Sequence, residues 1–125
     1  MDGGRAELSG RIANNERGIH VGYGGSLLIQ DGIVENNSGD GVYLVGASAL
    51  KMSRSIIRGN GRSGINILDH SVARFMPPGS SQVINNGGAG LKCEPAPATA
   101  VINGVVGTVS GNAEGQNLCP ATPWM

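Results

Sequence analysis

Few side chains of this chain could take part in catalysis, and the most suggestive two are adjacent. Asp69 is followed directly by His70, and a carboxylate that orients an imidazole is a common acid–base pair in enzymes. Neighbouring residues of a β-strand point to opposite faces, so these side chains could meet only within a turn. We therefore interpret them first as turn residues and only second as an acid–base pair.

A run of cations is the second group that could carry function. Lys51, Arg54, Arg58 and Arg62 follow one another with no Asp or Glu between them. Such a run could line a groove for a polyanion, for example a polysaccharide of uronic acids. It could also be a solvated face whose cations pair with acids elsewhere in the fold. The choice depends on the elements that position these residues.

The elements follow from an internal repeat that is marked by asparagine. Asparagines recur at spacings of 22, 23, 26 and 26 residues, each with a β-branched aliphatic residue three positions before it. They are Asn15, Asn37, Asn60, Asn86 and Asn112. A period of this length is typical of solenoids, in which stacked repeats bury one another's apolar sides. Asparagine at a fixed corner tolerates a left-handed turn and can hydrogen-bond the next coil.

Each repeat is predicted to hold three short strands separated by polar or glycine turns. In the first full repeat they cover 19–21, about 27–29 and about 33–36, with apolar residues in alternation. Aligned repeats give three inward columns: Ile19, Val42, Ile65, Leu91; Val21, Leu44, Ile67, Cys93, Cys119; and Ile29, Met52, Phe75, Val101. The two longer repeats are expected to place their extra residues after the third column. Coils about 4.8 Å apart would turn these columns into ladders.

The same alignment offers acids to most of the cations. The predicted pairs between neighbouring coils are Asp31 with Arg54, Glu35 with Arg58, and Asp40 with Arg62. This structural interpretation is favoured over an anion groove. Lys51 and Arg74 share a column in which we find no obvious acid, so they are the better candidates for meeting an anion.

The outward column of the first strand holds side chains that suit sugar binding. An exposed tyrosine can stack on a sugar ring, although varied polar residues on the wet side of a strand also arise by chance. The candidate substrate-binding residues are His20, Tyr43, Asn66 and Lys92 in this column, Tyr23 and His70 at its rim, and Lys51 and Arg74.

The two cysteines share one inward column in successive coils. Cys93 and Cys119 would then lie at a separation that a disulfide can bridge. The alternative is two buried thiols that pack as small apolar residues, which is favoured in a reducing cytosol. No set of four Cys and His ligands exists in the sequence, so neither a metal nor another cofactor is predicted.

Composition bounds the class of protein. With 125 residues the chain is expected to be one domain, 1–125, with an N-terminal edge or cap at 1–11, repeats at 12–112 and a C-terminal cap or tail at 113–125. Zero net charge gives no sign of nucleic acid binding. No apolar run suits a membrane span, and the start lacks a secretory signal. We expect a cytoplasmic protein as written, or an extracellular one if the chain is a fragment.

The repeat resembles the right-handed parallel β-helix of the pectate-lyase-like superfamily. The pattern G-[IV]-x-[VIL], a polar turn and then [VI]-x-x-N covers roughly Gly10 to Cys119. The resemblance implies an all-β solenoid of about five rungs with three short strands per rung, and a sugar held on the first-strand face. The NTD, DD, GHG and RIK patterns of polygalacturonase-like hydrolases are absent, as are the Asp cluster of pectate lyases and the DPH motif of alginate epimerases. The fold is therefore expected without the activity.

We expect a non-catalytic binding or assembly module that binds a carbohydrate, forms a homo-oligomer, or does both. Open β-helix ends expose strand edges that invite pairing with another chain, so a homo-oligomer is expected to form through an exposed end or through a flank. One alternative is a fragment of a polysaccharide lyase or epimerase acting on uronic-acid polymers, with His70 or Tyr43 as proton acceptor and Lys92 or Arg74 neutralising a carboxylate. Another is a structural piece of a tailspike or adhesin. Neither nucleic acid nor membrane is an expected partner.

Overall fold

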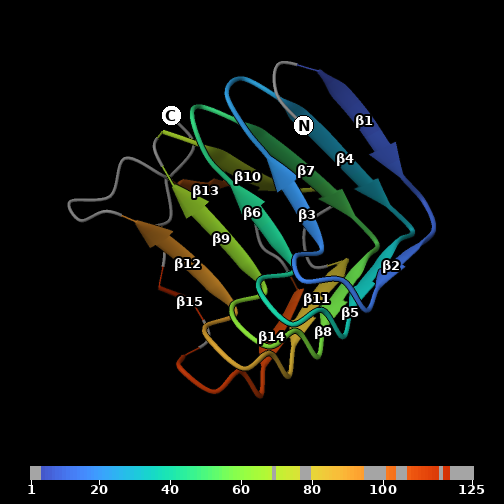
Figure 1. Ribbon diagram of the computed structural model, residues 1–125, viewed down its shortest axis with the longest axis vertical. Helices are drawn as coiled ribbons and strands as arrows, with labels where there is room; N and C mark the ends of the chain where they lie inside the picture. Colours follow the sequence, from blue (N-terminus) through green and yellow to red (C-terminus); the bar gives the residue numbers. More distant parts are fainter. Residues whose placement is uncertain are drawn as a thin grey trace.

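The computed structural model describes residues 4–68, 70–76, 80–94, 101–103, 107–115 and 117–118. Over these residues the chain consists of short strands and turns, with no helix that could cross a membrane. The strands wind in succession round a three-sided solenoid (Figure 1). The coils are, in order, β1 (Arg5–Leu8), β2 (Arg11–Ala13) and β3 (Ile19–Val21); β4 (Ser26–Gln30), β5 (Ile33–Glu35) and β6 (Val42–Leu44); β7 (Ala49–Ser53), β8 (Ile56–Arg58) and β9 (Ile65–Leu68); β10 (Val72–Phe75), β11 (Ser81–Ile84) and β12 (Leu91–Glu94); β13 (Val101–Asn103), β14 (Gly107–Ser110) and β15 (Asn117–Leu118).

Successive coils stack into three parallel sheets of five strands each. The first sheet contains β1, β4, β7, β10 and β13, the second β2, β5, β8, β11 and β14, and the third β3, β6, β9, β12 and β15. The predicted all-β parallel solenoid of about five rungs with three strands per rung is confirmed. Strand β1 lies within the expected N-terminal edge or cap, and β15 lies within the expected C-terminal cap or tail.

The inward columns form the core, as the repeat predicts. Ile19, Val42, Ile65 and Leu91 pair in register in the third sheet, as do Val21, Leu44, Ile67 and Cys93. All of these side chains except Ile19 and Cys93 are fully buried, and each buried Val, Ile or Leu contributes about 1.5–3 kcal/mol. The last predicted member of this column, Cys119, lies outside the described residues.

The third predicted column is wrong at its last member. Ile29, Met52 and Phe75 pair in register as expected, but Val101 pairs with Val72 rather than with Phe75. The extra residues of the last long repeat therefore fall between β12 and β13, before the column instead of after it. Both placements keep the repeat length, so spacing alone could not distinguish them.

An asparagine ladder runs along the corner between the second and third sheets. The backbone N–H and the side-chain Nδ2 of Asn37 both donate to Asn60 Oδ1, at 3.2 and 2.9 Å. Asn60 donates to Asn86 in the same way, and Asn86 donates to Asn112. All four are buried, with 2–5% of their surface exposed. The ladder satisfies buried polar groups from coil to coil, which explains the repeat of this residue.

The left-handed turn of this corner belongs to the residue before each ladder asparagine, which corrects the expectation for the asparagine itself. Positive φ is found at Asn14, Asn36 and Asn85, at 62°, 57° and 57°, and glycine takes this position at Gly59 and Gly111. Asn and Gly are the residues that tolerate this conformation best. Each copy of the corner thus combines a residue that tolerates positive φ with an asparagine whose side-chain amide joins the ladder.

The glycines that precede β3, β6 and β9, namely Gly18, Gly41 and Gly64, are required by close contact with the next coil. A Cβ on Gly41 would lie 2.7 Å from Gly64 O and 2.8 Å from Asn60 Nδ2. A Cβ on Gly64 would lie 2.9 Å from Asn86 Nδ2. Any side chain here would push the ladder apart, so a glycine column accompanies the asparagine column.

Serine columns at the other two corners were not anticipated. Ser48 N donates to Ser71 Oγ at 3.0 Å, and Ser55 N donates to Ser81 Oγ at 3.1 Å. These serines are buried. The hydroxyls of Ser55, Ser71 and Ser81 each accept a backbone N–H from a neighbouring coil, and that of Ser48 donates to Val21 O. All three corners therefore carry buried polar contacts between coils.

Candidate functional site

The candidate residues do not share one face. His20, Tyr43, Asn66 and Lys92 form one outward column of the third sheet, as predicted. Lys51 and Arg74 are neighbours in register on the first sheet. Tyr23 and His70 lie in the turns that connect the third sheet to the first, and both are exposed. The candidate residues therefore form two surfaces, one on the third sheet and one on the first sheet, and the turns with Tyr23 and His70 form the rim between them.

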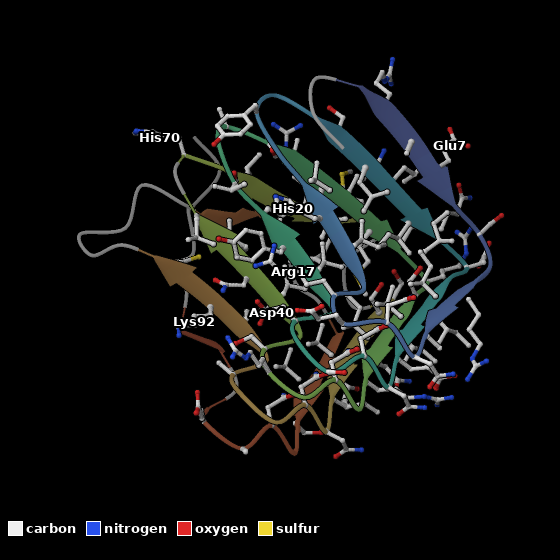
Figure 2. The ribbon with its side chains drawn as sticks, viewed as in Figure 1. Glu7, Arg17, His20, Asp40, His70 and Lys92 are labelled. Atoms are coloured by element: carbon white, nitrogen blue, oxygen red, sulfur yellow. The ribbon has the colours of Figure 1, made fainter. Side chains whose placement is uncertain are left out.

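On the third sheet, the ring of Tyr43 is partly covered by its neighbours. His20 meets it edge-on with ring centroids 5.1 Å apart, and the guanidinium carbon of Arg17 lies 4.8 Å from the Tyr43 centroid. Arg17 Nη1 also lies 3.3 Å from His20 Nδ1, and Figure 2 shows these two residues close together. Arg17 was missed by sequence reasoning because it belongs to a turn, outside the strand columns. Its cation–π contact reduces the ring surface that a sugar could stack on.

Further along the same face lies a polar hollow of about 290 Å³. Its charged and amide-bearing lining residues are Asp40, Arg62, Asn66, Lys92 and Glu114. The Asp40 carboxylate accepts hydrogen bonds from Ser63 N at 2.9 Å and Asn66 Nδ2 at 3.4 Å. The predicted Asp40–Arg62 ion pair is therefore wrong, because the backbone and an amide occupy this carboxylate.

A larger groove, of about 680 Å³, lies over the first sheet. Its floor consists of two outward columns in register, formed by β1, β4, β7 and β10. One column reads Arg5, Ser26, Ala49 and Val72, and the other Glu7, Leu28, Lys51 and Arg74. The groove thus crosses four coils and combines apolar patches with exposed charges.

The charges of this groove are arranged asymmetrically. Lys51 and Arg74 sit one coil apart in one column, about 4.8 Å along the axis. Within the described residues, no carboxylate forms an ion pair with either cation. Glu7 lies at the far end of the same column, separated from Lys51 by Leu28. This arrangement can hold an anion beside a flat apolar strip.

Two other cations of the predicted run, Arg54 and Arg58, form ion pairs, which confirms the structural interpretation for these two. Arg54 Nε donates to Asp31 Oδ1 at 2.9 Å, and Arg58 Nε donates to Glu35 Oε1 at 2.8 Å. Arg11, which sequence reasoning missed, donates to the other oxygen of Glu35. Arg11 lies on the outward face of β2, the strand that pairs with β5, which carries Glu35. The repeat alignment, extended to the first coil, predicts Arg11 as a second partner of Glu35.

These contacts shift the acidities of the paired groups. Hydrogen bonds from Arg11 and Arg58 lower the pKa of Glu35 below its ordinary value. The hydrogen bond from Arg54 lowers the pKa of Asp31, and the same contact raises the pKa of Arg54. The lowered pKa values keep both carboxylates ionised at neutral pH, so each remains paired with its arginine.

Cys93 takes part in a disulfide bond. Its predicted partner in the second column, Cys119, lies outside the described residues. The disulfide interpretation therefore holds for Cys93 over that of a free buried thiol. Among the described residues, no group of three or more His, Cys, Asp or Glu side chains is placed to hold a metal ion.

The family model described as right handed beta helix region matches residues 2–106. The match covers most of the chain, so the protein belongs to the right-handed β-helix family. No curated protein and no solved structure matched the chain in the corresponding searches. Membership fixes the fold and its handedness, whereas function must be argued from the surfaces described above.

Proposed function

We propose that this protein is a non-catalytic module that binds an acidic polysaccharide in the groove over its first sheet. The observation that carries the proposal is the pair of neighbouring cations, Lys51 and Arg74, beside an apolar strip on a groove that crosses four coils. Arg54 and Arg58 are held by carboxylates, whereas the charges of Lys51 and Arg74 are available for a ligand.

The shape and chemistry of the groove favour a sugar polymer. A polysaccharide is a linear chain whose rings have apolar C–H faces, and such faces fit the strip formed by Leu28, Ala49 and Val72. Uronic-acid residues add carboxylates, which a lysine and an arginine can bind by charge-assisted hydrogen bonds. The periodic floor suits a ligand that is itself periodic.

The remaining candidate residues would contribute from the side. Tyr23 is 71% exposed in the turn before β4, where its ring could stack on a sugar at the edge of the groove. His70 occupies the corresponding turn before β10. The column of His20, Tyr43, Asn66 and Lys92 would be a secondary surface, because Arg17 already covers part of the Tyr43 ring.

Isothermal titration with polygalacturonate and alginate tests the proposal, with an uncharged polysaccharide as the ligand control. The Lys51→Glu/Arg74→Glu variant should weaken binding about tenfold or more, since each 1.4 kcal/mol of lost interaction is a factor of ten. Arg62→Glu is the matched control, because Arg62 is an exposed cation outside this groove, and it should change Kd less than about twofold. No binding of either acidic polymer by the wild type, or an unchanged Kd in the double variant, would overturn the proposal.

A further inference from the structure

The N-terminal end of the solenoid exposes strand edges on all three sides. Among the strands that the structure describes, β1, β2 and β3 are the terminal strands of their sheets, and each has a neighbouring strand on one side only. Figure 1 shows β1 at the outer edge of its sheet beside β4. The backbone groups on the outer edges of these strands meet no further strand within the described residues. Open strand edges are templates for pairing with another chain.

The core is also incompletely covered at this end. The inward residues of the first coil, Leu8, Ile12 and Ile19, are only half-buried. Their counterparts one coil further on, Ile29, Val34 and Val42, are 0% exposed. The asparagine ladder ends here as well, since Asn15 donates its backbone N–H to Asn37 Oδ1 while its own side chain is exposed. The end thus combines apolar surface with unused hydrogen-bonding groups.

We propose that a second copy of this chain docks head to head on this end, related to the first by a two-fold axis. When two coils of the same hand face each other, their strands run in opposite directions. β1 of one copy therefore meets β1 of the other as an antiparallel pair. The contact uses the same surface on both copies, so it closes as a dimer and does not extend into a filament.

The charges of β1 select this partner and one register. Arg5 and Glu7 lie on either side of the exposed Ala6, and Ala6 and Leu8 pair with the buried inward residues Leu27 and Ile29 of β4. Figure 2 shows Glu7 on this outer strand. With Ala6 on the two-fold axis, Arg5 of each copy lies opposite Glu7 of the other. An axis at Arg5 or at Glu7 would instead set like charges opposite each other, which is destabilising. The axis at Ala6 is therefore the one symmetric register that pairs Arg5 with Glu7 on both sides of the axis.

The same axis positions the rest of the end. The two-fold axis crosses the end of the solenoid from β1 to the opposite corner, between β2 and β3, where the asparagine ladder begins with Asn15. Strand β2 of one copy then meets β3 of the other, and the half-buried Ile12 and Ile19 come under cover. The side-chain amides of the two Asn15 residues approach each other near the axis, where each can donate to and accept from the other.

Size-exclusion chromatography with light scattering, without any polysaccharide, tests the arrangement. The wild type should show twice the monomer mass at micromolar concentration. Glu7→Arg and Arg5→Glu should each halve that mass, and the double variant Arg5→Glu/Glu7→Arg should restore it, because the exchange recreates both opposite-charge pairs. Gln82→Arg, an exposed site on β11, is the control and should leave the dimer intact. A wild type that stays monomeric, or a dimer that neither single variant affects, would overturn the proposal.

A cysteine at the axis tests the register directly. Directly opposite residues of an antiparallel pair lie about 4.5–5.5 Å apart between Cα atoms, which a disulfide can bridge. Ala6→Cys should therefore form a covalent dimer on a non-reducing gel, whereas Gln82→Cys should not. Failure of Ala6→Cys to cross-link in a dimeric sample would exclude this register. The readout is independent of polysaccharide binding, so the two proposals can fail separately.

Discussion

Two corners of the solenoid border the third sheet, and they differ in how strictly their residue types are repeated. The ladder corner, between the second and third sheets, repeats asparagine at Asn37, Asn60, Asn86 and Asn112, all of them buried. The rim corner, between the third and first sheets, carries Tyr23–Gly24, Gly46–Ala47 and His70 in equivalent turns. Tyr23, Ala47 and His70 have positive φ there, and their residue types have nothing else in common.

The difference shows where stacking constrains the sequence. At the ladder corner the partner of each side chain is the same side chain one coil away, so a change in one copy disrupts two contacts. At the rim corner Ser48 and Ser71 also make a buried contact between coils, whereas the residues with positive φ, Tyr23, Ala47 and His70, are exposed and share only their backbone conformation. Chemistry can therefore vary along the rim while the ladder holds the coils in register.

Removal of a central ladder amide should have the largest effect. Asn60→Ala deletes the acceptor of the Asn37 backbone and side chain and the donor to Asn86. Buried groups are left unpaired, and we expect a loss of about 3 kcal/mol of unfolding free energy. Urea denaturation measures it.

Asn15→Ala is the matched control for that change. Asn15 sits exposed at the end of the ladder, and its contact with Asn37 is through the backbone. We expect a loss below about 1 kcal/mol. Equal losses for Asn15→Ala and Asn60→Ala would contradict the ladder as the source of stability.

Glycine substitutions sharpen the same comparison. Gly41→Ala at the ladder corner forces a Cβ to within 2.7 Å of Gly64 O, and we expect a cost of about 2–3 kcal/mol. Gly24→Ala at the rim corner meets no atom within 4 Å, and its φ of +78° is the source of strain, so about 1 kcal/mol is expected. Thermal or urea unfolding of the two variants decides the order, and a costlier rim substitution would reverse the comparison.

Stability should fall in acid through the ion pairs of the outer surface. The folded-state pKa of Glu35 is lowered by Arg11 and Arg58, so its contribution is fully present above the unfolded value of about 4.3. The contribution is lost as pH falls from there through the lowered folded-state pKa. Glu35→Gln should flatten this part of the stability curve, measured by urea unfolding between neutral pH and the acid limb. If Glu35→Gln leaves the fall of unfolding free energy in acid unchanged, the contacts of Glu35 with Arg11 and Arg58 do not contribute to stability.

The smallest effect is expected at the rim. His70→Gly places the most permissive residue at a φ of 63°, so relief of strain is offset by the greater entropy of the unfolded chain. The free energy of unfolding should change by less than about 0.5 kcal/mol. A large loss in thermal unfolding would mean that the rim side chain is part of the scaffold.

The sequence predicted most of the fold because its repeat reports the stacking directly. Val21, Leu44 and Ile67 could be placed in one column from spacing alone, and the structure pairs them in register. The prediction failed at Val101, where an inserted segment could lie on either side of a strand. Periodicity gives the length of a coil but does not locate an insertion within it.

The candidate site was less predictable. The outward column of His20, Tyr43, Asn66 and Lys92 was found, since it follows from strand alternation. The contact of Arg17 with Tyr43 was missed, because turn residues obey no column. Whether any of these residues binds a ligand remains a prediction for the titrations proposed above.

By itself the sequence determined the coil, the inward columns except at Val101, and the asparagine ladder, because each is enforced by similar or identical neighbours one repeat away. Only the tertiary structure decided that Asp40 binds Ser63 and Asn66 rather than Arg62, and that the first sheet carries a groove. Those features depend on side-chain directions in turns and on the concavity of a whole sheet, and a linear period carries no information about either.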